Sequence, residues 1–484
     1  MYPPRRPFGS VPLFVGPTTE GAPMSVATKT LTCAPPAVES RRLHLVPANV
    51  RPLPVEQLQG IPLTAHYELG VPTVHRTVVD FANFDHGATA PALRSVETAV
   101  AAVQRVSGSV HRGAGHTSRQ TTQWFEQARI EVGRFVGARE HDHVVFTRNT
   151  TDALRLLAHA LPRRTQVFTW DSAHHAAQFA WTGRNVHRLP IPASAQNALD
   201  LLTGALATST ADHKLVVITG ACNVTGEIWP IAELASIAAE FGARTVLDAA
   251  QLAPHHRVDI DELGVDWVAL SGHKAYAPYG AGALVGRSNW LDDAQPYLPA
   301  GGATRTVTAR TVEWNVGPAR HEGGTPNAVG AIALAAACAT LAKHHEAITA
   351  HEQVLHTRLR DGLESIHGVR LVSVLGSDRP NVGVVTFTVD GYDCSLVSQV
   401  LSDEYGIAVR DGKFCAHRLC DQVIGGCAVR ASIGLATQPH HIDRLINGVR
   451  KLLAHGPAMD YVHTEGVGWS APQDPRDLSE PLPW

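Results

Sequence analysis

The pattern of hydrophobic and polar positions changes near residue 80 and again near residue 326. Between these points, short apolar runs alternate with segments of helical periodicity. The helical segments include 121–138 and 231–243, and the apolar runs are HVVFT, QVFTW, KLVVITG, RTVLDAA, WVALSG and 282–285. Short apolar strands separated by helices predict an α/β fold, with a mainly parallel sheet covered by helices on both faces.

After residue 326 the pattern predicts a smaller α+β domain. A long helical stretch begins at Ala328 and is expected to break near His344 or later. Strands are predicted in VRLV, VGVVTFTV, IAVRDG and AVRASIGL, with one helix in SLVSQVLSDEY and a closing helix that ends near Leu453. The predicted domains are therefore 76–325 and 326–455. The Pro-rich ends, 1–75 and 456–484, are predicted to be a mobile or loosely docked extension and a peripheral tail.

Composition narrows the class of protein. The 484 residues are 44% hydrophobic and 18% charged, with a formal net charge of -3. This balance is that of a soluble globular protein and gives no electrostatic reason to expect a nucleic-acid partner. The sequence has no continuous apolar stretch near the roughly 20 residues that span a bilayer, and its start has no signal-peptide core, so no membrane association is expected. The seven irregularly spaced cysteines favour reduced thiols in a cytoplasm, and most of the 27 histidines are expected on solvated surface.

Polar residues follow each predicted strand. Thr150 and Thr151 follow HVVFT at the expected start of a helix, where free N–H groups and the helix dipole favour an anion. Capping of that helix by Asn149 or Thr150 is the simpler alternative. The other strand-end residues are His174, Asn223, Asp248, Gln251, Ser271, His273 and Lys274.

The carboxyl ends of parallel strands lie at one edge of a sheet, so these residues are expected to meet there. A lysine such as Lys274 loses hydration between two apolar strands unless its amine has a use. An anion site, an aromatic His174, a carboxylate and a lysine together describe a pyridoxal 5'-phosphate site. In such a site Asp248 keeps the pyridine nitrogen protonated, and Lys274 forms the Schiff base and shuttles protons.

The same residues carry a resemblance to a known family. From about residue 80 to 453, the chain resembles the class V, fold-type I pyridoxal-phosphate enzymes, and most of all the cysteine desulfurase and selenocysteine lyase branch. The matching segments include SVHRGAGHTSRQTT, RNTTDAL, AHHA, CNVTGEIWPI, LDAAQ, SGHKAYAPYGAGAL, EGGTPN, VRDGKFCAH and VRASIGL. The resemblance implies a large domain with a seven-stranded-type, mainly parallel sheet and a smaller C-terminal domain.

The resemblance also implies a role for each matching residue. Lys274 would be the Schiff-base lysine, Asp248 would pair with the ring nitrogen and Gln251 with the ring hydroxyl. His174 would stack on the ring. The phosphate would be held by Thr150, Thr151, Ser271 and His273. Thr325 would reach the phosphate of a neighbouring subunit, which implies a homodimer with shared sites. The residues expected to bind the substrate are His111, Asn223, Arg410 and Arg430.

The segment VRDGKFCAHRLC matches the part of the desulfurases that carries a reactive cysteine. Cys415 would take sulfur from the substrate amino acid as a persulfide, release alanine and pass the sulfur to an acceptor protein. Neighbouring cationic side chains are expected to favour its thiolate. The family pattern has proline where this chain has Arg418, and Cys420 is an addition. Zinc binding by Cys415, Cys420, Cys427 and His417 is not favoured, because the paired spacing of common zinc sites is missing.

Three functions remain open from the sequence. The leading one is cleavage of the carbon–sulfur or carbon–selenium bond of cysteine or selenocysteine, with catalysis by Lys274, His174 and Cys415. The second is a lyase or epimerase of the same family that acts on another amino acid, for which Cys415 is not needed. The third is a scaffold without turnover, which the presence of Lys274, Asp248 and His174 argues against.

Overall fold

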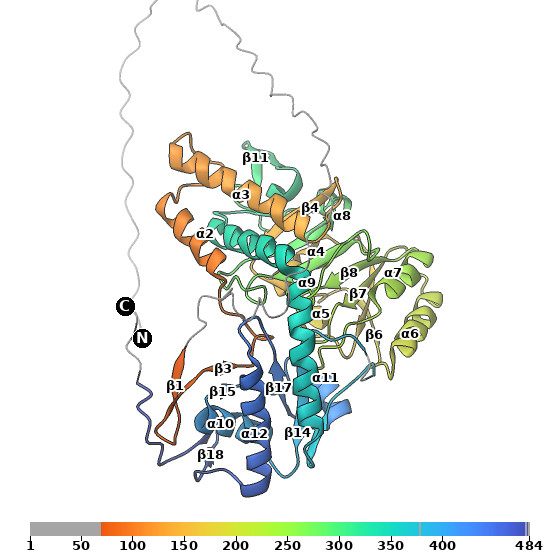
Figure 1. Cartoon of the computed structure of the whole chain (residues 1–484). Coiled ribbons are helices and arrows are strands. Elements are labelled where there is room, and N and C mark those ends of the chain that lie inside the picture. The colour runs from red at the N-terminus through yellow and green to blue at the C-terminus, as the bar shows by residue number, and fades with distance from the viewer. Residues whose placement is uncertain (1–68, 377–378, 480–481, 483–484) are drawn as a thin grey trace, which may run out of the picture. The chain divides into compact units, whose positions relative to one another are not determined.

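The computed structural model describes residues 69–376, 379–479 and 482, all within one compact unit, 52–484. Most of the predicted N-terminal extension, 1–75, therefore lies outside the described residues. The described chain contains a large α/β domain and a smaller α+β domain (Figure 1).

A seven-stranded sheet forms the centre of the large domain, in the order β4-β10-β9-β8-β7-β5-β6. Only β10 runs antiparallel to its neighbours, so the predicted mainly parallel sheet is confirmed. β6 was not predicted, because its sequence, NVHRL, alternates polar and apolar residues at the edge of the sheet. The strands are β4 (Asp142–Thr147), β5 (Gln166–Trp170), β6 (Asn185–Leu189), β7 (Lys214–Thr219), β8 (Arg244–Asp248), β9 (Trp267–Ser271) and β10 (Gly282–Arg287).

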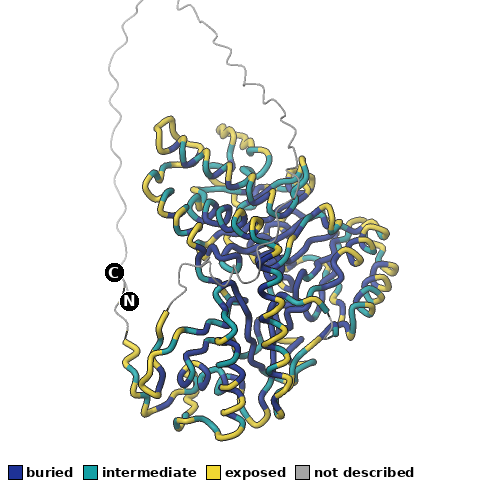
Figure 2. Tube along the Cα trace, viewed as in Figure 1, coloured by how far each residue is buried: buried dark blue, intermediate teal, exposed yellow. Residues whose placement is uncertain are grey.

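Helices pack against this sheet through apolar faces. Val132 of α3 and Leu154 of α4 are fully buried, as the 3.6-residue period requires. Burial is continuous through the sheet and decreases toward the outer faces of the helices (Figure 2). The helices are α2 (Arg94–Arg105), α3 (His116–Phe135), α4 (Thr150–Ala160), α5 (His175–Phe179), α6 (Ala195–Ala207), α7 (Ile231–Glu240) and α8 (Asn289–Asp293).

The small domain has its own sheet, in the order β13-β14-β17-β16, and its own hydrophobic core. Short N-terminal strands join it, because β15 (Ile407–Ala408) pairs in parallel with β3 (Ala82–Asn83). The main elements are β13 (Val369–Leu371), β14 (Val384–Val389), α10 (Cys394–Tyr405), β16 (Arg410–Gly412), α11 (His417–Leu419), β17 (Ala428–Ser432) and α12 (Pro439–His455).

The long helix α9 (Ala328–Glu364) links the two domains. It packs on α2 and α3 near its start and on α12 farther along. The predicted break is not an interruption, because α9 is one continuous helix that changes direction along its length (Figure 1). Among the described helices, α9 alone is long and apolar enough to cross a membrane, and 44% of its most apolar window is buried. Its packing is that of a core helix.

One prediction about side chains was wrong. Cys394, at the start of α10, forms a disulfide with Cys427, which precedes β17, so not all thiols are reduced. The two residues are 33 apart in sequence, and only tertiary packing brings their Cα atoms to 6.1 Å. The prediction for the histidines concerned most of them and is not contradicted, but five are buried, with exposed fractions of 6% or less. They are His86, His255, His321, His351 and His441.

The C-terminal tail is a peripheral part of the small domain, and the structure shows how it is attached. Its hairpin pairs β18 (Val462–Thr464) with β19 (Gly468–Ser470). Farther along, Arg476 forms a buried ion pair with Asp403 of α10, with an N–O distance of 2.7 Å. The backbone N–H of Ala458 also donates to Glu404. These contacts fix the tail to α10.

Candidate active site

A pocket of about 240 Å³ lies at the carboxyl ends of β4, β5, β7, β8 and β9. It brings together twelve of the fourteen residues predicted for the site. These are Thr150, Thr151, His174, Asn223, Asp248, Gln251, Ser271, His273, Lys274, Arg410, Cys415 and Arg430. The strand-end argument is therefore confirmed for the residues of the large domain, and the small domain contributes the last members of the set.

The start of α4 forms one wall of the pocket. The side chain of Asn149 caps the helix by accepting from the N–H of Asp152 at 3.0 Å. The hydroxyl of Ser271, at the end of β9, accepts from the N–H of Thr150 at 2.8 Å and lies 2.9 Å from its hydroxyl. Capping and anion binding are thus compatible here, because the cap takes the N–H of Asp152 and not that of Thr151, which lines the pocket.

Asp248, which is buried, and Lys274 interact electrostatically in the pocket. Burial raises the pKa of Asp248 above its usual range, against the effects of the Ala250 N–H and the Lys274 charge. Burial also lowers the pKa of Lys274 to about 8, while Asp248 opposes that shift. A lysine with such a pKa has a substantial neutral fraction near neutral pH, and a neutral amine is a nucleophile.

His174 and Gln251 face the same space. The Nδ1 atom of His174 accepts from the N–H of Ala176 at 3.1 Å, so the neutral ring carries its proton on Nε2. Burial and, after it, the Lys274 charge lower the pKa of His174 to about 3, which keeps the ring neutral. The amide nitrogen of Gln251 donates to the carbonyl of Gly87 at 2.7 Å, while its Oε1 is buried without a partner.

Arg430 and Arg410 supply the positive charge of the pocket. Arg430 is 3% exposed and donates to the carbonyl of Asn223 at 2.7 Å. Asp85 lies 3.4 Å from Arg430 and 3.8 Å from Arg410, distances too long for strong hydrogen bonds. Burial raises the pKa of Asp85 in spite of both arginines. A carboxylate ligand can therefore compete for the two guanidinium groups.

Cys415 enters the pocket on a short loop from the small domain. Its thiol belongs to an exposed residue, unlike those of Cys222, Cys338 and Cys420, which are buried. Cys427 is bonded to Cys394, and Cys420 donates to the carbonyl of Lys413. The cysteines near this loop therefore have separate partners and do not converge as metal ligands would.

Two predicted residues do not line this pocket within the described chain. His111 lines a separate pocket and its ring lies 2.9 Å from Glu126. Thr325 is exposed, between Gly324 and Pro326 of that second pocket. The roles predicted for these two residues remain predictions.

The sequence did not predict several residues that line the pocket, among them Gly87, Ala88 and Phe414. Gly87 and Ala88 belong to FDHGATA, a strand-to-loop signal at the start of the domain. The N–H of Gly87 donates to the hydroxyl of Ser432 at 2.8 Å, which ties this loop to β17. The loop follows β3, a strand of two residues, and so short a pattern does not predict the place of the loop beside the pocket.

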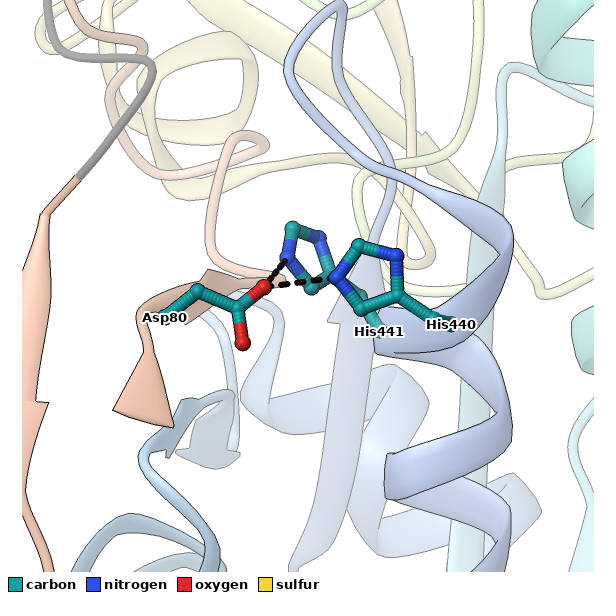
Figure 3. Close-up of side chains that lie close together, drawn as sticks. All are labelled: Asp80, His440 and His441. Carbon is teal, nitrogen blue, oxygen red and sulfur yellow. Dashed lines mark hydrogen bonds and ion pairs between the residues drawn. The ribbon is translucent and has the colours of Figure 1, made fainter. Parts of the chain in front are cut away.

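A second polar cluster lies outside the pocket. Both rings at the start of α12 point at one carboxylate oxygen, with His440 Nε2 and His441 Nε2 each 2.6 Å from Asp80 Oδ2 (Figure 3). Arg444 binds the other oxygen at 2.8 Å. Burial of Asp80 raises its pKa, but these three hydrogen bonds outweigh burial, so the pKa lies well below the usual range.

This cluster has the geometry of hydrogen bonds rather than of a metal site. His441 Nδ1 accepts from the N–H of Gln438 at 3.2 Å, so Nε2 carries the proton of the neutral ring and has no lone pair for a metal. Donor atoms around a tetrahedral zinc lie about 3.3 Å apart, farther than the 2.6 Å between each ring and Asp80. The cluster ties β2 (Val78–Asp80) to α12.

The fold and pocket define a class, that of α/β enzymes with a lysine, a buried carboxylate and a helix start at one sheet edge. The chain belongs to the aminotransferase class-V family, whose family model matches residues 82–445. This confirms the family indicated by the sequence motifs, and the fold-type I architecture agrees with the structural comparisons below.

Curated relatives and solved structures that are named as cysteine desulfurases match this chain. A probable cysteine desulfurase 2 of Mycobacterium leprae is 34% identical over 72% of this chain and 85% of the relative. A probable cysteine desulfurase of Halobacterium salinarum is 33% identical over 76% of this chain and 91% of the relative. The apo cysteine desulfurase of Thermococcus onnurineus superposes with a TM-score of 0.70 and 29% identity, covering 77% of this chain and 95% of that one. An Escherichia coli cysteine desulfurase in an S-sulfonic acid form superposes with a TM-score of 0.70 and 27% identity, covering 84% of this chain and 99% of that one.

Proposed function

We propose that this chain is a pyridoxal 5'-phosphate-dependent cysteine desulfurase that converts L-cysteine to L-alanine and leaves the sulfur on Cys415 as a persulfide. The observation that carries the proposal is the meeting of Lys274 and Cys415 in one pocket. Lys274 comes from the large sheet and Cys415 from the small domain. A lyase or epimerase of the same fold needs the lysine but has no use for an exposed thiol at this place.

The pocket fits the cofactor. Gln251 offers a buried, unpartnered Oε1 to a hydroxyl, and Asp248 offers a buried carboxylate to a protonated ring nitrogen. The start of α4, with Thr150 and Ser271, suits a phosphate, and Lys274 is the residue that would hold the aldehyde. When bound, pyridoxal phosphate accepts electron density from the substrate carbons.

The side chains of this chain then have separable tasks. Arg430 and Arg410 bind the α-carboxylate of the amino acid in place of their long contacts with Asp85. The neutral amine of Lys274 removes the α-proton. His174, neutral with its proton on Nε2, holds a donor on one face of the substrate.

Sulfur transfer is balanced without an outside oxidant. The Cys415 thiolate attacks the substrate sulfur, so that a sulfur–sulfur bond forms as the bond from sulfur to Cβ breaks. The electron pair of the broken bond stays on the carbon side, which takes up protons to become alanine. A reductant or the thiol of an acceptor protein then removes the outer sulfur from Cys415.

We also propose a homodimer with shared sites. Thr325 is exposed and lies outside the lysine pocket of its own chain, which supports the role of reaching a neighbouring phosphate. Three exposed apolar side chains lie on or directly after the hairpin of β11 (Thr304–Val307) and β12 (Val312–Trp314), and they are those of Val307, Val312 and Val316. An exposed apolar patch is typical of a protein contact. Sedimentation of the purified protein would contradict this proposal if it gave a monomer at micromolar concentration.

The experiment that tests the function uses purified protein loaded with pyridoxal phosphate, L-cysteine and dithiothreitol. The expected products are alanine and sulfide in equal amounts. A cofactor-loaded protein that leaves cysteine unchanged would refute the desulfurase proposal. It would leave the lyase or epimerase as the better account, and other L-amino acids would then be screened for the loss of their α-proton in D₂O.

A further inference from the structure

The loop that carries Cys415 is held in an unfavourable backbone conformation. Phe414 and Cys415 both have positive φ angles, 50° and 54°, in the left-handed region that residues other than glycine seldom adopt. Two such residues in succession persist only where their surroundings determine them. The loop therefore needs contacts that hold it in place, and without them a more relaxed conformation is within reach.

Three contacts with the large domain hold this loop. The side chain of Asn223 donates to the carbonyl of Phe414 at 2.7 Å. The N–H of His175 donates to the carbonyl of Cys415 at 2.9 Å. Arg418 Nη1 donates to Asp171 Oδ1 at 2.5 Å. The first two fix the carbonyls of the strained residues, and the third fixes the short helix α11 that follows them.

We infer that Arg418 is a positioning residue for Cys415, which acts through its ion pair with Asp171. This inference rests on the proposed sulfur transfer to Cys415. Asp171 directly follows β5 and is held by its own backbone, since its N–H donates to the carbonyl of Leu189. Arg418 thus joins the loop of the small domain to a fixed point of the large sheet, three residues after the thiol.

The other charged pair of the loop cannot do this. Lys413 and Asp421 lie 2.6 Å apart, but both belong to the loop segment itself. His417 meets His175 only through an edge-to-face ring contact, with centroids 4.8 Å apart. Among the described contacts, Arg418 with Asp171 is the ion pair that joins this loop to the large domain.

A partly exposed ion pair can have this effect in spite of its small strength. The exposed fractions of the side chains are 47% for Arg418 and 18% for Asp171, and such pairs contribute little to the stability of a whole protein. The population of a strained loop, however, depends on small free-energy differences between its conformations. Loss of the pair is therefore expected to release the thiol without unfolding the chain.

The test compares Arg418→Ala, Arg418→Lys and Asp171→Asn in a Cys33→Ser background. Cys33 lies outside the described residues, and Cys222, Cys338 and Cys420 are buried, so iodoacetamide without reductant reports on Cys415. Arg358→Ala is the matched control, because it breaks a similarly exposed pair, with Asp443, elsewhere on α9 and α12.

Arg418→Ala and Asp171→Asn are each expected to raise the alkylation rate of the resting protein by about threefold or more, because a released thiol spends more time in solvent. The rate of persulfide formation in one turnover is expected to fall about tenfold, with KM for cysteine nearly unchanged, since a small displacement of a reacting atom costs much in rate. Arg418→Lys should restore both values in part, and the double variant should match the single ones.

Alkylation rates of Arg418→Ala and Asp171→Asn equal to those of the parent and of Arg358→Ala would overturn the inference. Asp171→Asn keeps the size of the side chain and its backbone bonds, so it serves if Arg418→Ala fails to fold. Alkylation needs no substrate. A parent protein that leaves cysteine unchanged would refute the proposed function, while the alkylation series would still decide whether Arg418 positions the thiol.

Discussion

Lys274 and Cys415 face the same pocket, but the chain holds them by different means. Lys274 follows β9, a strand whose five residues are all buried in the large sheet. The N–H of Gly272 donates to the carbonyl of Ala281, which directly precedes β10, so the backbone on this side continues the pairing of the sheet. Cys415 is exposed and has a left-handed backbone, and its loop is held by two side chains and one backbone N–H of the other domain.

This difference matches what each residue has to do. A lysine that holds a cofactor needs one position, and a strand end in a packed sheet provides it. A thiol that takes sulfur from a buried substrate and then gives it to an outside acceptor must reach both, and an exposed loop allows that. Substitutions on the lysine side, around Lys274, are therefore expected to reduce activity only when they remove a reacting group. On the cysteine side, around Cys415, substitutions that displace the thiol are expected to reduce activity as well.

The largest expected effect is on the lysine side. Lys274→Ala removes the amine without disturbing the buried strand, so cysteine turnover is expected to fall by about 10³-fold or more. The visible absorbance of bound pyridoxal phosphate should shift as the covalent attachment is lost, while the far-ultraviolet circular dichroism stays that of the parent. Turnover within tenfold of the parent would exclude Lys274 as the catalytic base.

Cys415→Ser should separate the contribution of the thiol to the reaction from that of Lys274. Serine keeps the size of the side chain but cannot take sulfur, so alanine formation is expected to fall by about 10²-fold. The cofactor absorbance and its change on cysteine binding should remain, because Lys274 and the arginines are untouched. Full alanine production by the variant would show that cleavage of the carbon–sulfur bond does not need Cys415, and it would contradict sulfur transfer to this thiol. Cys222→Ser, at a buried cysteine, is the control.

The same comparison shows how far the sequence could predict the site. Lys274, Asp248 and Asn223 follow apolar strands, and strand ends of one parallel sheet meet by topology, so their place followed from the pattern. The motif around Cys415 predicted that the thiol belongs to the site, but not the conformation of its loop. That conformation depends on Asn223, His175 and Asp171, which are about 190 to 250 residues away in sequence.

The long-range pairings of the fold show the same limit. Cys394 and Cys427 had no spacing that marked them as a pair, and the buried His86 looks like any other polar loop residue. Strand and helix periodicity are local signals, whereas these features depend on how the small domain packs. The pairing of the short strand β3 with β15 of the small domain was not predicted for the same reason.

The disulfide is expected to support the cysteine side. It closes a loop of 33 residues and ends three residues before Arg430 on β17. Such a crosslink contributes about 3–4 kcal/mol in the chain-entropy account. The double variant Cys394→Ser/Cys427→Ser should lose about that free energy of unfolding in urea. Dithiothreitol should destabilise the parent similarly and leave the variant unchanged, and a parent insensitive to dithiothreitol would contradict the expectation.

The smallest effect concerns the lysine side at low pH. Burial, and after it the charges of His255 and His441, lower the pKa of His86 to about 3. The unfolded chain binds a proton near its ordinary pKa of 6.5, while the folded chain does not, so stability is complete above pH 6.5 and is lost as pH falls toward 3. The loss is about 1.4 kcal/mol per pH unit, or about 2 kcal/mol at pH 5.

His86→Leu should therefore reduce the difference in free energy of unfolding between pH 7.5 and pH 5 by about 2 kcal/mol, whatever its own stability at pH 7.5. The exposed His455→Leu is the control and should leave that difference as in the parent. His86 directly precedes Gly87 and Ala88, which line the pocket. In the same loop, the N–H of Ala90 donates to the carbonyl of His273. An unchanged difference in His86→Leu would mean that His86 takes up its proton in the folded state. The buried region beside Lys274 would then accept a protonated histidine. The difference between the surroundings of Lys274 and Cys415 would in that case lie in backbone geometry alone.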